Sequence, residues 1–171
     1  MLELGGLWAA HFFMARDPIL AAFDQQFTAI DRRSRHLLSL VTQDILFAQP
    51  DGLDIPRLSC GECLLRSAAA VEKTFGGITT RLWDDPFEWT LPEKLSTPAA
   101  VGDYLDEVEQ VRRRGFEYFT SDKDLTRELP APERLRTLAD LLLETIAVAS
   151  HFQGRAFAVY GHVSGRRPPN L

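Results

Sequence analysis

The strongest constraint on the fold is a helical spacing of apolar residues that begins after Asp17-Pro18. An aspartate N-cap followed by proline at the first helical position is a common helix start. Apolar side chains then recur mostly every third or fourth residue, at Ile19, Phe23, Phe27, Ile30, Leu37, Leu38, Val41 and Ile45. This spacing places them on one face of a helix. It predicts a first long helix that reaches Ile45 and ends before Pro50.

A second helix is predicted from Ser59 to the glycine pair Gly76-Gly77. Glu62 follows Ser59 at the third position, as in a capping box, and glycines commonly end helices. Residues 78–97 show no clean period, and we interpret them as a long connection packed by aromatic side chains. The aromatic residues of this connection are Trp83, Phe87 and Trp89. They could instead form a dimer contact or a lid over a pocket.

Two further helices are predicted in the second half of the chain. Thr97-Pro98 opens the third as Asp17-Pro18 opens the first, and the stretch ELPAPER (128–134) ends it. Thr137 opens the fourth, which is apolar almost all round and therefore expected to be the most buried. It stops at Gly161 or Gly165. The pattern predicts an all-α four-helix bundle, in which the long connection lets the second and third helices run parallel.

Length and charge narrow the class of protein. The 171 residues suffice for a single domain with its own core, with residues 1–16 as an N-terminal extension. A net charge of -5 argues against nucleic-acid binding, which needs clustered basic residues. The short arginine groups are interpreted as solvated faces or tail: Arg32-Arg33, Arg112-Arg113-Arg114 and Arg166-Arg167. No apolar run is long enough for a membrane span and the N-terminus makes a poor signal peptide, so we expect a cytoplasmic protein without a membrane partner.

Three stretches of the chain resemble the DinB-like family, named for DNA-damage inducibility. SCGECLLRSAAAVEKTFGG (59–77) resembles the second helix of that family, and VGDYLDEVEQVRRRGFEYFTSDKDL (101–125) resembles the third. TLADLLLETIAVASHFQGRAFAVYGHVSGRRPP (137–169) resembles the last helix and tail. With the first helix, the likeness covers nearly all of residues 20–169. It implies an up-down-down-up bundle, a homodimer and a link to stress response.

The resemblance also implies a divalent metal held by three histidines, one on the second helix and two on the fourth. This sequence departs from that pattern at each position, which falls on Arg66, Val148 or Phe152. Valine and phenylalanine have no donor atom, and a guanidinium stays protonated. His151 lies one residue before the usual second ligand of the fourth helix, which rotates its side chain by about 100°. The sequence therefore predicts a degenerate site with no metal ligands and no catalytic residues.

A ligand pocket is predicted on the face where the metal would lie. Glu144, Val148, His151 and Phe152 share one broad face of the fourth helix. We expect Arg66 to approach this face as the fixed positive charge of a pocket for a small anion. Glu144 or Glu62 would then hold it, because an unpartnered buried charge is very costly. The alternative is that Arg66 extends to the surface or makes a structural ion pair.

Other titratable residues give weaker signals. Cys60 and Cys63 form a CxxC at a predicted helix start, where the helix dipole could lower a thiol pKa. A CxxC alone supplies two of four zinc ligands, and a small core role for Cys63 is the competing interpretation. His151 is a candidate general base, and the alternative is that it takes no part in catalysis or binding. His11 and His36 have no partner readable from the sequence, and His162 falls near a helix end.

Two functional hypotheses follow from the sequence. The first is a dimeric small-ligand-binding or interaction protein without a metal cofactor. The second is a metal-dependent enzyme, a thiol-dependent transferase, isomerase or hydrolase, that binds zinc, nickel or iron through Glu144, His151 and other residues. We interpret Gly154 as a residue that lets helices approach closely.

Overall fold

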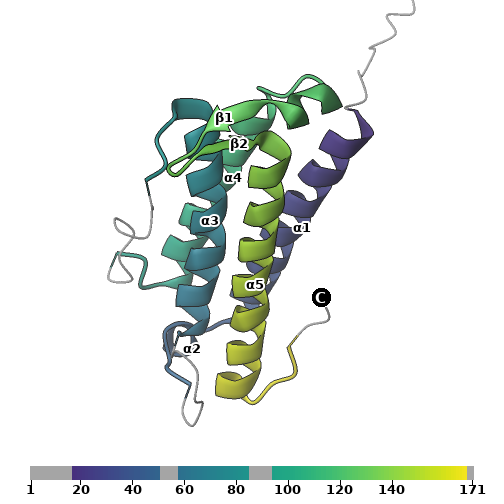
Figure 1. The fold of residues 1–171 in the computed structure, drawn as a ribbon. Helices are drawn as coiled ribbons and strands as arrows, with labels where there is room; N and C mark the ends of the chain where they lie inside the picture. Colours follow the sequence, from purple (N-terminus) through teal and green to yellow (C-terminus); the bar gives the residue numbers. More distant parts are fainter. Residues whose placement is uncertain (1–16, 51–57, 85–93, 169–171) are drawn as a thin grey trace, which may run out of the picture.

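The computed structural model describes residues 17–50, 58–84 and 94–168, which form a bundle of four long helices (Figure 1). These helices are α1 (Pro18–Leu40), α3 (Cys60–Thr80), α4 (Pro98–Phe116) and α5 (Leu138–Ser164). α1 packs against α4 and α5, and α3 packs against the same two helices. α3 and α4 run parallel to each other and antiparallel to α1 and α5 (Figure 1). The predicted up-down-down-up, all-α bundle is confirmed.

The helix starts follow the caps read from the sequence, with one exception. Ser59 Oγ accepts the Glu62 backbone N–H at 3.2 Å, and Glu62 Oε2 accepts the Ser59 N–H at 2.7 Å, so the capping box is confirmed. Thr97 and Thr137 also cap their helices through their side chains. Asp17 makes no side-chain cap on α1. Its carboxylate accepts the backbone N–H of Asp122 at 2.8 Å, and the Asp122 carboxylate caps α1 instead.

The boundaries differ from prediction at two helix ends. α1 ends at Leu40, and the short helix α2 (Gln43–Leu46) follows it, so the expected continuous helix to Ile45 is wrong. α3 passes Gly76-Gly77 and ends at Thr80, with Arg81 in the left-handed region at φ 64°. Gly77 lies inside the helix, and its missing side chain leaves room for the Trp83 indole, with which a Cβ would overlap.

A small β-hairpin, not expected from the sequence, closes one end of the bundle. After the 3-10 helix η2 (Asp122–Thr126), β1 (Glu128–Pro130) pairs antiparallel with β2 (Leu135–Thr137). The hairpin begins within the stretch read as a helix breaker, and it leads directly into α5. Each strand has only three residues, which is too short for an alternating pattern to be visible in the sequence.

The core is aromatic at its centre and α3 is its most buried helix. The rings of Phe27, Phe75 and Phe116 pack against one another, with centroids 5.2–6.0 Å apart. α3 buries more residues than the longer α5, so the prediction that the last helix is the most buried is wrong. α5 packs on α3 and α1 and leaves one side open, where Leu143 is 59% exposed. No described helix is long and apolar enough to cross a membrane.

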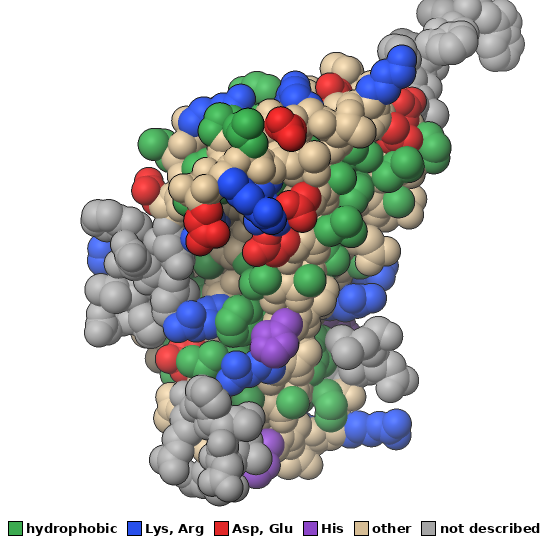
Figure 2. Space-filling view, viewed as in Figure 1, with side chains coloured by type: hydrophobic (Ala, Val, Ile, Leu, Met, Phe, Trp, Pro, Cys, Tyr) green, Lys and Arg blue, Asp and Glu red, His purple; other side chains and the backbone are tan. Residues whose placement is uncertain are grey.

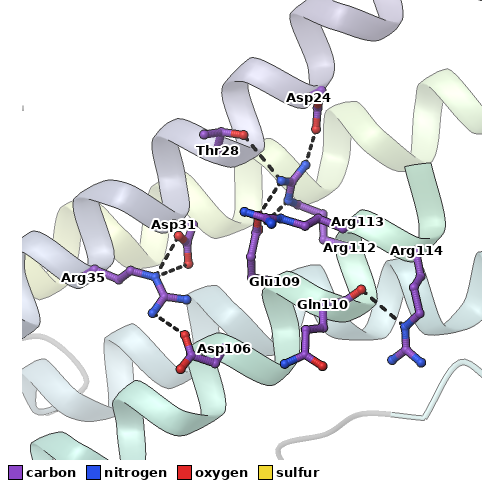
Figure 3. Close-up of polar contacts among 10 residues, drawn as sticks. All are labelled: Asp24, Thr28, Asp31, Arg35, Asp106, Glu109, Gln110, Arg112, Arg113 and Arg114. Carbon is purple, nitrogen blue, oxygen red and sulfur yellow. Dashed lines mark hydrogen bonds and ion pairs between the residues drawn. The ribbon is translucent and has the colours of Figure 1, made fainter. Parts of the chain in front are cut away.

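A buried ion cluster joins α1 and α4 (Figure 3). Arg112 is only 4% exposed, which corrects the prediction of a fully solvated arginine group. Its guanidinium donates to both oxygens of Glu109 at 2.7 Å and pairs with Asp24 across the helix interface. Because Arg112 pairs with two carboxylates and packs over the Phe116 ring, its charge is compensated inside the bundle.

Candidate functional site

The side chains at two of the three positions that would carry metal ligands lie against each other on the outer face of α3 and α5. The guanidinium carbon of Arg66 lies 5.9 Å from the centre of the Phe152 ring. Arg155, one turn further along α5, lies 6.0 Å from the same ring. The exposed His151 ring packs edge-on against Phe152 at 5.3 Å. We call Arg66, His151, Phe152 and Arg155 the cationic cluster.

The other predicted pocket residues are placed differently. Glu62 is engaged in the N-cap of α3, where it also accepts the Ser59 hydroxyl at 2.8 Å. The Glu144 carboxylate pairs with Arg136 of β2 rather than with Arg66. Val148 is 38% exposed and, with Glu144, lines a hollow nearer the hairpin. The structure thus brings Arg66, His151 and Phe152 together and leaves the predicted acids with other partners.

The residues at the three ligand positions do not fit a divalent cation. A guanidinium is positive and has no lone pair to donate, and the side chains of Val148 and Phe152 are hydrocarbons. Within residues 17–50, 58–84 and 94–168, no three His, Cys, Asp or Glu side chains are grouped closely enough to hold a metal ion. No step of chemistry can therefore be derived through a metal at these positions.

The two cysteines are buried and their thiols are poor nucleophiles. Burial raises the pKa of Cys60 to about 12, and the nearby Cys63 adds to the shift. Burial also raises the pKa of Cys63 to about 11, although Arg155 and Arg66 oppose this rise. A redox dithiol needs accessible thiolates, and the raised pKa values disfavour the thiolate form of both cysteines at neutral pH. Cys63 lies in the hydrophobic core, which agrees with its interpretation as a small core residue.

The remaining sequence-predicted residues fall outside the cluster. Trp83 packs on Gly77 and its Nε1–H donates to the Pro130 carbonyl at 3.0 Å, so it fastens the connection to the hairpin. Phe87, Trp89 and His11 lie outside the described residues. His36 and His162 are exposed on other parts of the bundle.

Gly154 does not serve a close helix contact within the chain. It is exposed, and a Cβ added there would meet nothing within 4 Å. The prediction that it lets helices approach is therefore wrong for the bundle itself. The described glycines that do permit close packing are Gly61, Gly77 and Gly115, where Phe47, Trp83 and Phe75 respectively occupy the space of a side chain.

Sequence reasoning missed Arg155 and the hairpin residues around the site. Arg155 lies three residues after Phe152, so the helical neighbour rule could have placed it on the same face. Arg136 could not be placed, because the strand that carries it was not predicted.

A crystal structure of a DinB-like protein from Bacillus cereus ATCC 10987 has the same architecture. The two superpose with a TM-score of 0.63 at 17% sequence identity, over 87% of this chain and 95% of that chain. No protein-family model and no curated protein matches the chain. The structural likeness shows that this chain has the DinB-like fold.

Proposed function

We propose that this protein binds a small anion at the cationic cluster and does not use a metal there. The observation that carries the proposal is the placement of two guanidiniums, Arg66 and Arg155, within cation–π distance of the one ring of Phe152. In the metal-binding pattern of the DinB-like family, this ring and Arg66 stand at ligand positions. A fixed cation pair in place of a metal ion preserves the positive charge of the site.

The physical basis is the planar fork of the arginine side chain. A guanidinium can donate two parallel N–H bonds to a carboxylate or phosphate. The contact with Phe152 keeps both guanidiniums near one ring, which reduces the entropy lost when an anion binds between them. The exposed His151 imidazole packs against the same ring and adds a further N–H donor.

The test uses inorganic phosphate followed by NMR of the His151 imidazole and the arginine side chains. We expect saturable shifts in the wild type that Arg66→Met abolishes, because methionine retains the apolar stem but not the charge. Arg32→Met, at an exposed position of α1, is the matched control and leaves the titration unchanged. An Arg66→Met protein that folds and gives the wild-type titration contradicts the proposal.

Metal analysis tests the competing hypothesis of a metal-dependent enzyme. Protein purified without a histidine tag should contain less than stoichiometric zinc, nickel or iron, and chelation should leave its fold unchanged. A stoichiometric transition metal would overturn the proposal. The homodimer, the stress-response link and the cytoplasmic location stay predictions from the sequence.

A further inference from the structure

A hollow lies where the β-hairpin overhangs the groove between α3 and α5. The hollow there has a volume of about 530 Å³, within the range of about 300–1,000 Å³ that small-molecule sites occupy. One wall comes from Ala70, Lys73 and Thr74 of α3, and the opposite wall from α5. The α5 wall and the overhang are formed by Leu141, Glu144, Thr145, Val148, the turn 131–134, Arg136 and Trp83. Acidic and basic side chains gather on this face below the hairpin (Figure 2).

The walls of this hairpin hollow are held in place by contacts that its lining residues make with one another and with their neighbours. The Trp83 indole packs on Gly77 of α3 and its N–H donates to the Pro130 carbonyl of β1. This side of the hollow is therefore attached to both α3 and the hairpin. Arg136 donates to Asp140 at 2.7 Å and pairs with Glu144, which ties β2 to α5. A site whose lining is fixed before binding loses less entropy when the ligand enters.

The floor of the hollow offers no hydrogen-bond donor to a ligand. Thr145 Oγ1 donates to the Leu141 carbonyl at 2.7 Å, and Thr74 Oγ1 therefore donates to Thr145 Oγ1, also at 2.7 Å. Both hydroxyl protons are used within the protein, and around them lie Ala70, Leu141 and Val148. The deep part of the site therefore suits the apolar part of a ligand.

The charges at the mouth favour an anion over a cation. Lys73 is the only charged residue that α3 contributes to the lining, and its chain neighbour Glu72 is engaged by the Tyr104 hydroxyl at 2.6 Å. On the opposite wall, the Glu144 carboxylate is already paired with Arg136. Arg134 adds a second cation from the turn, next to Glu133. A ligand carboxylate near α3 therefore meets Lys73, while a ligand amine near α5 meets an acid that is already neutralised.

We propose that the hairpin hollow binds a small organic carboxylate with an aromatic or aliphatic body. The carboxylate pairs with Lys73 and Arg134, and the body packs between Trp83 and the apolar floor of α3 and α5. This site is distinct from the cationic cluster, because Arg66, His151, Phe152 and Arg155 are not part of its lining. Either site can therefore be tested without the other.

The experiment compares phenylacetate with its neutral analogue phenylacetamide by calorimetry and by NMR of the Trp83 indole N–H. We expect phenylacetate to bind and to shift the Trp83 signal, and phenylacetamide to bind about tenfold more weakly, because it lacks the charge-assisted bond. Lys73→Met should weaken phenylacetate binding by a similar factor and leave phenylacetamide unchanged. Lys123→Met, at an exposed residue of η2 outside the lining, is the matched control.

The outcomes separate this proposal from the anion site at the cationic cluster. Equal binding of the acid and the amide, or undiminished phenylacetate binding by folded Lys73→Met protein, overturns the carboxylate assignment. Saturable phenylacetate binding that Arg66→Met abolishes and Lys73→Met does not would place that ligand at the cationic cluster instead. Absence of saturable binding by both compounds overturns the hairpin site and leaves the phosphate titration of Arg66 unaffected.

Discussion

Three described arginines lie over phenylalanine rings, and the surroundings of Arg112 differ from those of Arg66 and Arg155. Arg112 packs over Phe116 between α1 and α4, where Glu109 and Asp24 both bind its guanidinium (Figure 3). Arg66 packs over Phe152 on the outer face of α3 and α5, beside a second cation, Arg155. The acids predicted for Arg66 are instead engaged by Ser59 and Arg136.

An arginine packed on a phenylalanine ring can serve structure or binding, depending on which charged groups surround it. A buried guanidinium that carries two carboxylates holds helices together, and no ligand can reach it without breaking those bonds. Arg66 and Arg155 are half-buried on one ring with their positive charges close together, and the anion-binding proposal rests on this pairing. If this distinction is correct, removing Arg112 affects stability and removing Arg66 affects binding.

The largest effect is expected from Arg112→Met. The substitution leaves the Asp24 and Glu109 carboxylates without their shared cation in the α1–α4 interface, and we expect the free energy of unfolding to fall by about 3 kcal/mol. Urea denaturation measures this loss. Arg114→Met, on the exposed side of the same helix, should change stability by less than about 0.5 kcal/mol. Equal effects of the two substitutions would show that the buried cluster has no special role.

Gly115→Ala should destabilise the protein by about 2 kcal/mol. A Cβ at Gly115 would overlap with the Phe75 ring, which is fully buried between Phe27 and Phe116 and has no space to move into. Thermal unfolding followed by circular dichroism measures the loss. A melting temperature equal to the wild type would mean that the aromatic core at α4 is more loosely packed than the ring contacts indicate.

Acid pH should remove part of the difference between the wild type and Arg112→Met. Burial raises the pKa of Glu109, but hydrogen bonds from Arg112 and Arg113 outweigh it, so this pKa lies below its usual value. A lowered pKa in the folded state stabilises the protein above the unfolded pKa of about 4.3, and the gain is lost as the pH falls through the folded pKa. Urea denaturation from pH 6 down to pH 3 should show the two curves converging. A constant gap would exclude the Glu109 charge as its source.

Gly154→Ala should stabilise the protein by about 0.8 kcal/mol, opposite in sign to Gly115→Ala. Alanine has a higher helix propensity than glycine, and at Gly154 the added methyl group meets open space. Urea denaturation of both variants under the same conditions measures whether each change in the free energy of unfolding is positive or negative. A loss of stability in Gly154→Ala at high protein concentration alone would indicate that a second copy packs on this face of α5.

The helices could be predicted from the sequence because their signals are local. Ser59 and Glu62 cap the same turn they mark, and the apolar period of α1 needs no partner to be visible. The partners of charged residues depend on the whole bundle. The sequence predicts a solvated group at Arg112-Arg113-Arg114, because nothing in these residues indicates that Asp24 of another helix lies beside Arg112. The sequence offers Glu144, beside Glu62, as a partner for Arg66, because the three-residue strand that carries Arg136 leaves no periodic signal.

Arg66→Met is expected to change the free energy of unfolding by only about 0.5 kcal/mol, the smallest effect of the set. Methionine keeps an apolar stem against Phe152, so the packing on the ring is retained while the cation–π attraction is lost. Urea denaturation beside Arg112→Met measures this directly. A loss near 3 kcal/mol would mean that Arg66 is a structural ion like Arg112, and the anion-binding proposal would lose its basis. A small loss, combined with a lost phosphate titration, would separate the two arginines by function although each packs on a phenylalanine ring.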